Sequence, residues 1–510
     1  MPNKQDSNSS GLRYAEEVIG TLGTLIASPI WYPLEPNSYA DFGGEVSVVA
    51  RNPISEGRQR KKGVITDLDA SGGFNTDLSQ FNLTRLLQGA FFANIREKDT
   101  TEPMNGTAIP LTGVTTGPET YTAASGLDAF GADDLVFVSG CSTAANNGLK
   151  TVTAAAASVL TVSETLTAEA SPPAAAKIER VGIEGAAGDI DVLMSGSIAT
   201  LTSTALDFTT LGLIVGEWIW IGGDNATNQF AGATNSGFAR VSIIAANVLT
   251  LDKTPGGTMV TEASTTEEIH LYFGNMLKNE PLAANIIRRS YQFERTLGDD
   301  GVAVQSEYII GSMINEVTFN IATADKLTTD LTLVSTDHEQ RTGTVGVKAG
   351  TRPSIAVATA FNTSSDVTHK KLYTLDAADS NPTPLFAFLK ELTLTISNNV
   401  TPDKAVGVLG AFDVSVGTFE IGGSMTAYFA DVAAVTAVRN NANVTFDFSL
   451  VKENAGFLFD VPLLALGNGR LAVEQDQSIQ LPLDVMAAES ALGNTLTMMI
   501  FPYLPTLAEA

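Results

Sequence analysis

The sequence of 510 residues is poor in the side chains that build disulfides, metal sites and active centres. Its single cysteine, Cys141, excludes a framework of intrachain disulfides. Its three histidines, at positions 270, 338 and 369, lie too far apart for the ligand spacing of a zinc motif. A phosphate-binding loop, a nucleophile elbow and a His-Glu-x-x-His pattern are also missing. We therefore expect no enzymatic activity, no metal ion and no cofactor.

Positive charge is scarce as well. The chain has 30 Lys and Arg against 56 Asp and Glu, which gives a formal net charge of -26. A surface of that sign repels a phosphate backbone, so tight binding of nucleic acid is not expected. Passive transit of DNA is compatible with an acidic wall, because a conduit works best when it does not hold its cargo.

Long apolar runs are missing too, since no stretch reaches the roughly 18 apolar residues of a membrane-spanning helix. Residues 1–11 are polar and lack the basic and apolar regions of an export signal. We expect a protein that is made in a cytoplasm and does not insert into a membrane.

What the sequence does contain is typical of short strands joined by turns. Hydrophobic residues make up 44% of the chain, charged residues only 17%, and 45 glycines accompany abundant Thr, Ala, Val and Asn. This composition predicts a folded, mainly β protein of the α+β kind. Its length predicts two to four domains, because single cores stop growing at roughly 250 to 300 residues.

An internal repeat lies in the acidic central region, residues 105–270. Residues 135–165 contain three strand-like blocks punctuated by glycine turns, and residues 218–254 contain matching blocks about 89 residues later. The pattern predicts two tandem inserted β-sandwich (Ig-like) or barrel modules, with one large β domain as the alternative. Trp218 and Trp220 share one face of a strand in the second copy. We expect them to fill the core of that module rather than to form a sugar-binding platform.

The flanks of the insert carry two copies of a different pattern, in which a strand, a glycine pair, a strand and a capped helix follow one another. The first copy has glycines at 72–73 and a helix whose expected N-cap is Asn82. The second copy has glycines at 422–423 and a helix capped by Asp431. We interpret them as a duplicated unit, a sheet with one packed helix.

Two stretches, at 315–321 and 390–396, have apolar residues at alternate positions, as strands with one buried face do. We interpret them as a further pair of copies from the same duplication. The patterns together predict five segments: 1–104, the first part of one unit; 105–184 and 185–270, the two inserted modules; 271–335, the continuation of the first unit; and 336–510, the second unit.

The flanks also resemble the tail tube proteins of long-tailed bacteriophages. The resemblance rests on five stretches, at 11–17, 28–31, 58–78, 475–479 and 494–500. It covers roughly residues 11–97 and 271–505 and leaves out the insert. It implies a β-sandwich tube fold whose inner sheets join those of neighbouring subunits into a barrel around a lumen, so that edge strands pair between chains.

A duplicated unit predicts trimeric rings with pseudo-sixfold symmetry, stacked head to tail into a tube. The resemblance implies a virion protein whose tube carries DNA during ejection into the host. Such a protein contacts DNA only in transit, and its other partners are the tape measure, tail tip and tail terminator proteins. Modules on the outer wall would collide with a contractile sheath, which favours a non-contractile siphophage tail. The alternative reading is a β-repeat surface adhesin or surface-layer protein.

Two groups of charged residues are candidate sites. The only concentrated basic cluster is expected to dock on an acidic face of the adjacent ring, and it consists of Arg58, Arg60, Lys61 and Lys62. Acidic residues on or beside the expected inner strands are candidates for the lumen lining, and they are Asp67, Asp69, Asp77, Asp413 and Glu420. A solvated loop and ordinary surface acids are the respective alternatives. Acidic pairs at 133–134 and 299–300 lack the ligand ladder of a calcium loop and are interpreted as exposed turns.

Overall fold

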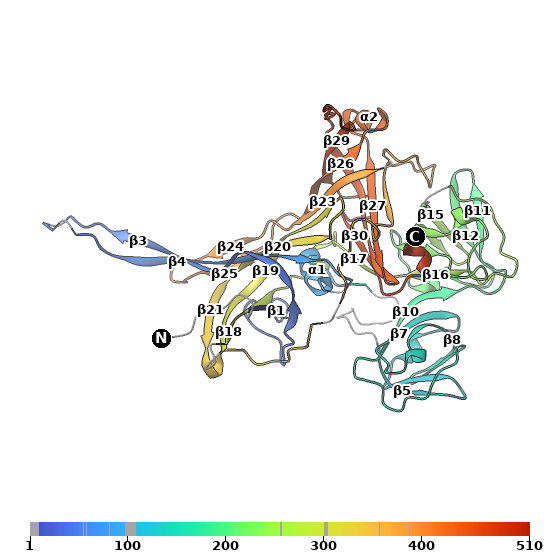
Figure 1. Ribbon diagram of the computed structural model, residues 1–510, viewed down its shortest axis with the longest axis horizontal. Helices are drawn as coiled ribbons and strands as arrows, with labels where there is room; N and C mark the ends of the chain where they lie inside the picture. Colours follow the sequence, from blue (N-terminus) through green and yellow to red (C-terminus); the bar gives the residue numbers. More distant parts are fainter. Residues whose placement is uncertain are drawn as a thin grey trace.

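The computed structural model describes residues 10–509, except 55, 58, 81, 97–108, 256–257, 300–303, 356–357 and 387. In these residues the fold is mainly β, as the composition predicts, with only two α-helices. Figure 1 shows a long ribbon that projects from one side of the body, and the central insert on the opposite side. Neither α-helix of the described residues has the length and apolarity needed to cross a membrane.

The largest sheet has 16 strands and contains both flanks of the insert. Its strands are β1 (Gly11–Glu16), β2 (Tyr32–Leu34), β3 (Pro36–Arg51), β4 (Lys61–Asp77), β17 (Asn275–Lys278), β18 (Tyr291–Asp299), β19 (Val304–Ala322), β20 (Thr328–Ser335), β21 (Asp337–Thr342), β22 (His369–Thr374), β23 (Leu389–Ser397), β26 (Glu420–Tyr428), β27 (Val444–Lys452), β28 (Ala455–Asn468), β29 (Gln480–Ala487) and β30 (Thr497–Phe501).

Within this sheet the order of strand pairing occurs twice. One set pairs in the order β1-β18-β19-β20-β4-β3, and the other in the order β22-β27-β28-β29-β26-β23. Helix α1 (Thr84–Phe91) follows β4 and packs on β19, while α2 (Ala433–Arg439) follows β26 and packs on β28. The duplicated unit with one packed helix is therefore present. We call the two sets the first and second units.

Both glycine pairs lie inside one continuous strand, β4 or β26, so the predicted break between two strands was wrong. Asp431 Oδ1 accepts a hydrogen bond from the backbone N–H of Ala433 at 2.7 Å and holds the turn that leads into α2. The N-cap of α2 is the next residue, Val432, whose side chain makes no capping bond, so the cap predicted at Asp431 is displaced by one residue. Asn82 does not cap α1: its side chain donates to the carbonyl of Asp77 and accepts from the N–H of Ser79. The Asn82 side chain therefore holds the preceding turn, and the prediction for this cap was wrong.

The two units are joined by β19 and β23. These strands pair antiparallel, with Val317 opposite Ile396 and Phe319 opposite Leu394. Their similar alternation comes from this pairing, because both strands turn one face to the same core. The two stretches are thus neighbours, and their interpretation as copies of one element was wrong: β19 corresponds to β28, and β23 to β3.

The insert forms a separate sheet of 12 strands. They are β5 (Ile109–Thr115), β6 (Thr120–Ala123), β7 (Asp134–Ser139), β8 (Gly148–Ala156), β9 (Val159–Val162), β10 (Lys177–Glu184), β11 (Asp191–Ser195), β12 (Ile198–Thr202), β13 (Trp218–Ile221), β14 (Gly237–Ala245), β15 (Val248–Lys253) and β16 (His270–Phe273).

The repeat in the insert is a repeat of strand pairing. The orders β5-β6-β9-β8-β7-β10 and β11-β12-β15-β14-β13-β16 match strand for strand, and each set encloses its own hydrophobic core. In the first set β10 also pairs with β5, which closes a ring of hydrogen-bonded strands. This half is therefore a small barrel, because β10 is paired on both edges, and the two-sheet Ig-like arrangement does not apply to it.

Candidate assembly surfaces and the insert junction

The projecting ribbon is the hairpin of β3 and β4, which stay paired from Pro36 and Thr76 out to Arg51 and Lys61 (Figure 1). Its outer part exposes large apolar side chains, each 46% to 60% accessible: Val46, Val48, Val49, Val64 and Ile65. A lone two-stranded ribbon is marginally stable in water. Exposed valine and isoleucine along such a ribbon indicate a surface that another chain covers.

The basic cluster lies at the free end of this ribbon. Lys61 and Lys62 open β4, Arg60 immediately precedes them, and all three are exposed. Arg58 falls outside the described residues. The structure therefore brings three of the four predicted contact residues together at the point of the chain that extends farthest from the body (Figure 1).

Two of the predicted lumen acids lie nearer the base of the ribbon. Asp67 and Asp69 both accept a hydrogen bond from Lys404 Nζ, at 2.5 and 2.7 Å. Lys404 ends β24 (Thr401–Lys404), which pairs with β25 (Ala411–Ser415) in a second, shorter hairpin. The hydrogen bond from Lys404 lowers the pKa of Asp67, and the two carboxylates raise the pKa of Lys404.

The other three predicted acids lie apart from that pair. Asp77 contacts Lys326 at 2.7 Å, and Asp413 contacts Arg288 at 3.3 Å. Glu420 is exposed at the start of β26. Four of the five acids therefore have a cation beside them, so their carboxylates present less free negative charge than the sequence alone indicates.

Each unit also has a strand edge whose partner differs between the two copies. In the first unit, the end of β19 pairs with β20 on one edge and with β23 on the other. In the second unit, residues 464–468 at the end of β28 pair with β29 on one edge. On the other edge, the pairing with β27 stops at Leu464, and no described strand pairs with β28 after that residue. The stretch 469–473 that follows exposes Leu471 and Val473. Likewise β3, the counterpart of β23, pairs only with β4 among the described residues.

The insert is held against the second unit by a hydrophobic junction. Trp218 and Trp220 are buried there, where they pack with Leu458 and Phe501 of the second unit. The prediction that the two tryptophans are packing residues is confirmed. They do not fill the core of their own module, however, because that core lies on the opposite face of β13 and contains Ile219 instead.

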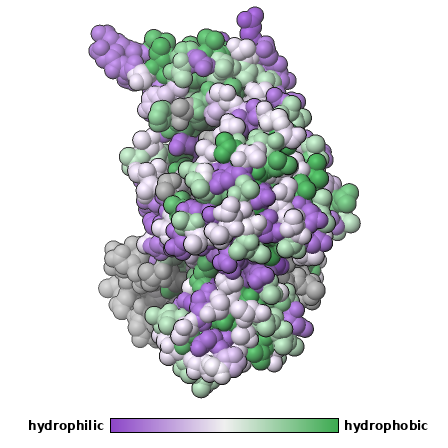
Figure 2. Space-filling model, turned by 90° about the vertical axis from the view of Figure 1, so that its right-hand side faces the viewer, coloured by the Kyte–Doolittle hydropathy of each residue, from purple (hydrophilic) through white to green (hydrophobic). Residues whose placement is uncertain are grey.

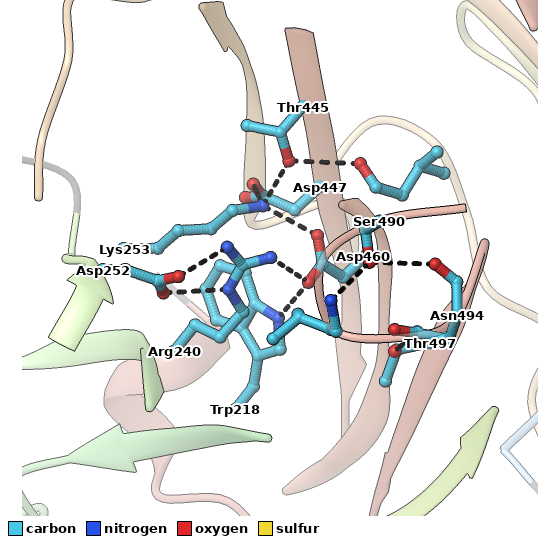
Figure 3. Close-up of polar contacts among 12 residues, drawn as sticks. Trp218, Arg240, Asp252, Lys253, Thr445, Asp447, Asp460, Ser490, Asn494 and Thr497 are labelled. Atoms are coloured by element: carbon cyan, nitrogen blue, oxygen red, sulfur yellow. Dashed lines mark hydrogen bonds and ion pairs between the residues drawn. The ribbon is translucent and has the colours of Figure 1, made fainter. Parts of the chain in front are cut away.

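At the centre of this junction is a buried polar network (Figure 3). Lys253, at the end of β15, donates from Nζ to Thr445 Oγ1 at 2.7 Å, to Asp447 Oδ2 at 2.9 Å and to Asp460 Oδ1 at 2.7 Å. Arg240 on β14 donates to Asp460 at 2.9 Å and forms two bonds with Asp252. Buried charges are tolerated only when they are paired in this way.

The rest of the network completes the hydrogen bonding of the two aspartates. Trp218 Nε1 donates to Asp460 Oδ2 at 3.0 Å, and His369 Nε2 lies 2.5 Å from Asp447 Oδ1. Burial would raise the pKa of Asp447, but Lys253 and His369 outweigh it and hold that pKa well below its usual range. Lys253 and Arg240 likewise lower the pKa of Asp460 against the effect of burial. Sequence reasoning missed this network, because its members lie up to 242 residues apart.

One acidic pair differs from its prediction. Asp134 is buried in β7 and not in an exposed turn, with Arg180 at 2.5 Å and the N–H of Gly131 at 2.7 Å from its carboxylate. Asp300 and the side chain of Asp299 fall outside the described residues. In the part of the chain that the structure describes, no group of three or more His, Cys, Asp or Glu is arranged to hold a metal ion.

The surface on the side of the insert is mixed in character. Figure 2 shows hydrophilic and hydrophobic residues interspersed over the coloured part of this face, with no single apolar area dominating it. Exposed apolar side chains occur on the ribbon, on the stretch 469–473 and in the β24–β25 hairpin, where Val406 and Phe412 are exposed.

A family model described as phage tail tube protein matches residues 7–487, nearly the whole chain and including the insert. No curated protein matches the sequence.

Proposed function

Since the chain belongs to the phage tail tube proteins, structural components of the virion tail that associate into a tube, we propose that three copies close into a ring of six similar units. Rings stack into a hollow tube through which DNA passes into the host. Assembly takes place in the host cytoplasm, with tape measure, tail tip and tail terminator proteins as the other partners.

The observation that supports this ring is the pairing of β19 with β23 inside one chain. That joint connects the first unit to the second. The equivalent joint from the second unit to the next copy would pair the stretch at 467–473 with β3, and both of these edges are open in the described residues. A chain with two equivalent units and one complementary joint left open is suited to ring closure, and three such chains give the six units proposed here.

A matched pair of substitutions tests the joint. Leu471→Asp places a charge on the open edge, whereas Leu193→Asp makes the same change on the insert, at a leucine that is similarly exposed (40% and 49%). We expect electron microscopy to show sixfold-looking rings and tubes for the parent and for Leu193→Asp, and separate monomers for Leu471→Asp. Tubes formed equally by both variants, or rings of another symmetry, would contradict the joint. Monomers or flat lattices of the parent protein would favour the surface adhesin instead.

Stacking is assigned to the ribbon. The end of the ribbon, which carries Arg60, Lys61 and Lys62, projects from the body (Figure 1). We assign these residues, with Arg58 close by in the sequence, to the contact with an acidic face of the adjacent ring, since the chain as a whole is acidic. A head-to-tail contact of this kind does not close, so it propagates into a filament whose length another component must set.

The insert is assigned to the outer wall. It lies on the side of the molecule opposite the ribbon and the joint between β19 and β23 (Figure 1). A tube decorated in this way suits a sheathless siphophage tail, and many copies of an exposed module strengthen weak contacts with a cell surface through avidity. The acids at 67, 69, 77, 413 and 420 are assigned to the lumen because they lie on or beside the strands expected to face it.

A further inference from the structure

The buried network of the junction contains the components of an amide-forming site. Lys253 and Asp447 belong to different parts of the fold, the insert and the second unit, and their Nζ and Oδ2 atoms are 2.9 Å apart. A second carboxylate, Asp460, is 2.7 Å from the same Nζ. All three side chains are at most 1% exposed.

We propose that Lys253 and Asp447 condense into an isopeptide bond, with Asp460 transferring protons, so that the insert is covalently fastened to the second unit. This inference does not depend on ring formation, since every participating group lies within one chain (Figure 3).

The hydrogen bonds assign different roles to the two aspartates. Asp460 accepts bonds from Arg240 and from Trp218 on Oδ2, and these donors stabilise its charged form. These donors make Asp460 a weak base and a poor electrophile, so we assign it to pass protons between Nζ and Asp447 without holding one. Asp447 Oδ1 instead faces His369 Nε2, which must be the donor because a carboxylate only accepts. That bond withdraws charge from the Asp447 carboxyl and stabilises an oxyanion formed on it.

The reaction needs no other reagent. One proton passes from the Lys253 ammonium through Asp460 to Asp447 Oδ2, which leaves a neutral amine beside a neutral acid. This neutral pair is the reactive species and a minor one, because Lys253 and His369 hold the pKa of Asp447 well below its usual range. The Nζ lone pair attacks Cγ of Asp447, and the negative charge that develops on Oδ1 is held by His369. A second Nζ proton passes through Asp460 to the Oδ2 hydroxyl, the Cγ–Oδ2 bond breaks and water leaves. One hydrogen remains on Nζ, and the charges of the ammonium and the carboxylate have cancelled.

The Nζ atom is enclosed on several sides. It lies 5.2 Å from the centre of the Trp218 ring and 5.5 Å from that of Tyr373, and it bonds to Thr445 and the two aspartates. Desolvation offsets much of the attraction in a buried ion pair, and the amide that replaces the pair carries no charge to desolvate. Fixed proximity raises the rate of such a bimolecular condensation by many orders of magnitude, and a bond formed once per molecule needs no fast turnover.

The mass of the intact, full-length protein tests the proposal directly. We expect the purified chain to be lighter than its sequence by one water, and a proteolytic digest to contain one branched peptide that joins Lys253 to Asp447. The Lys253→Arg variant keeps the positive charge and is expected to have the full mass. Asp460→Asn is expected to retain the full mass or to lose the water far more slowly.

The control is Lys371→Arg, the same change at a neighbouring lysine that bonds to the carbonyls of Thr254 and Pro255. It should lose the water as the parent does. The parent protein decides the question even if a variant does not fold. A full parent mass with separate Lys253 and Asp447 peptides, or a water loss mapped to any other residues, would overturn the assignment.

Discussion

A single glycine permits the close approach of strands β23 and β26. Gly423 has a φ of +146°, and a Cβ at this position would lie 2.0 Å from the carbonyl oxygen of Thr393 on the paired strand β23. Its neighbour Gly422 has no such conflict, because the nearest atom to an added Cβ is 3.6 Å away. The glycine pair seen in the sequence thus contains one position that requires glycine and one that does not.

We expect Gly423→Ala to lower the free energy of unfolding by about 2 kcal/mol, the scale of backbone strain at such a position. Gly422→Ala, as the control, should change it little. Thermal and chemical denaturation of the two variants measure the difference. Equal stability of both variants would show that β23 and β26 can shift to accept a side chain.

The acidic residues assigned to the lumen differ in how strongly they are neutralised. Asp77 has Lys326 beside it, whereas no Lys or Arg of the described residues lies within ion-pair distance of Glu420. If both line the lumen, Glu420 carries more of the repulsion that keeps DNA from adhering.

We expect Glu420→Gln to slow DNA ejection from virions more than Asp77→Asn does, and neutralisation of all five acids to slow it most. The rate of DNA release after triggering measures this effect. The differences should shrink as salt is added, because screening shortens the reach of the charges. Unchanged ejection at low salt would argue that these acids lie elsewhere on the surface.

At the scale of the element, the ribbon of β3 and β4 has features that contacts within its own chain do not explain. Its apolar side chains have no cover within the described chain, and its end carries the basic cluster. An isolated ribbon of this kind is stabilised by the partner it binds.

Reversing the charge of Arg60, Lys61 and Lys62 to glutamate is expected to leave single rings soluble and to stop their stacking. The ribbon would then repel the acidic face of the next ring. Electron microscopy and sedimentation distinguish rings from tubes. Lys370→Glu, at an exposed lysine of β22, is the control for the added negative charge, and normal tubes from the triple variant would refute docking through this cluster.

At the scale of the whole molecule, the insert has two different faces. One face packs on the second unit and is part of the fold, and the other is the proposed decoration of the outer wall. Its junction buries Trp218 and Trp220 against the second unit, beside the charged network of Lys253. Removing it would expose Val451, Leu458 and Phe501, together with Asp447 and Asp460 on the same faces of their strands.

Replacing residues 109–269 by a short flexible linker is therefore expected to give an aggregating protein. Each large apolar side chain that is exposed forfeits roughly 1.5 to 3 kcal/mol. Size-exclusion chromatography and dye binding report the outcome. A soluble, tube-forming deletion variant would show that the insert is a detachable decoration.

The sequence by itself determined what depends on local pattern. The repeat in the insert, the glycine pairs and the turn at Asp431 before α2 are visible because each involves residues near one another along the chain. The family resemblance and the mainly β character follow from the same local features, and the family match confirms both the tail tube assignment and its structural role.

Only the tertiary structure decided which elements meet. Alternation along 315–321 and 390–396 marks strands with one buried face, but it does not say that the two strands pair with each other. Likewise nothing near Lys253 in the sequence points to Asp447 and Asp460, since the three meet only when the insert packs on the second unit. A long-range contact depends on the path of the whole chain, and that path is the result of packing many faces at once rather than of any one segment.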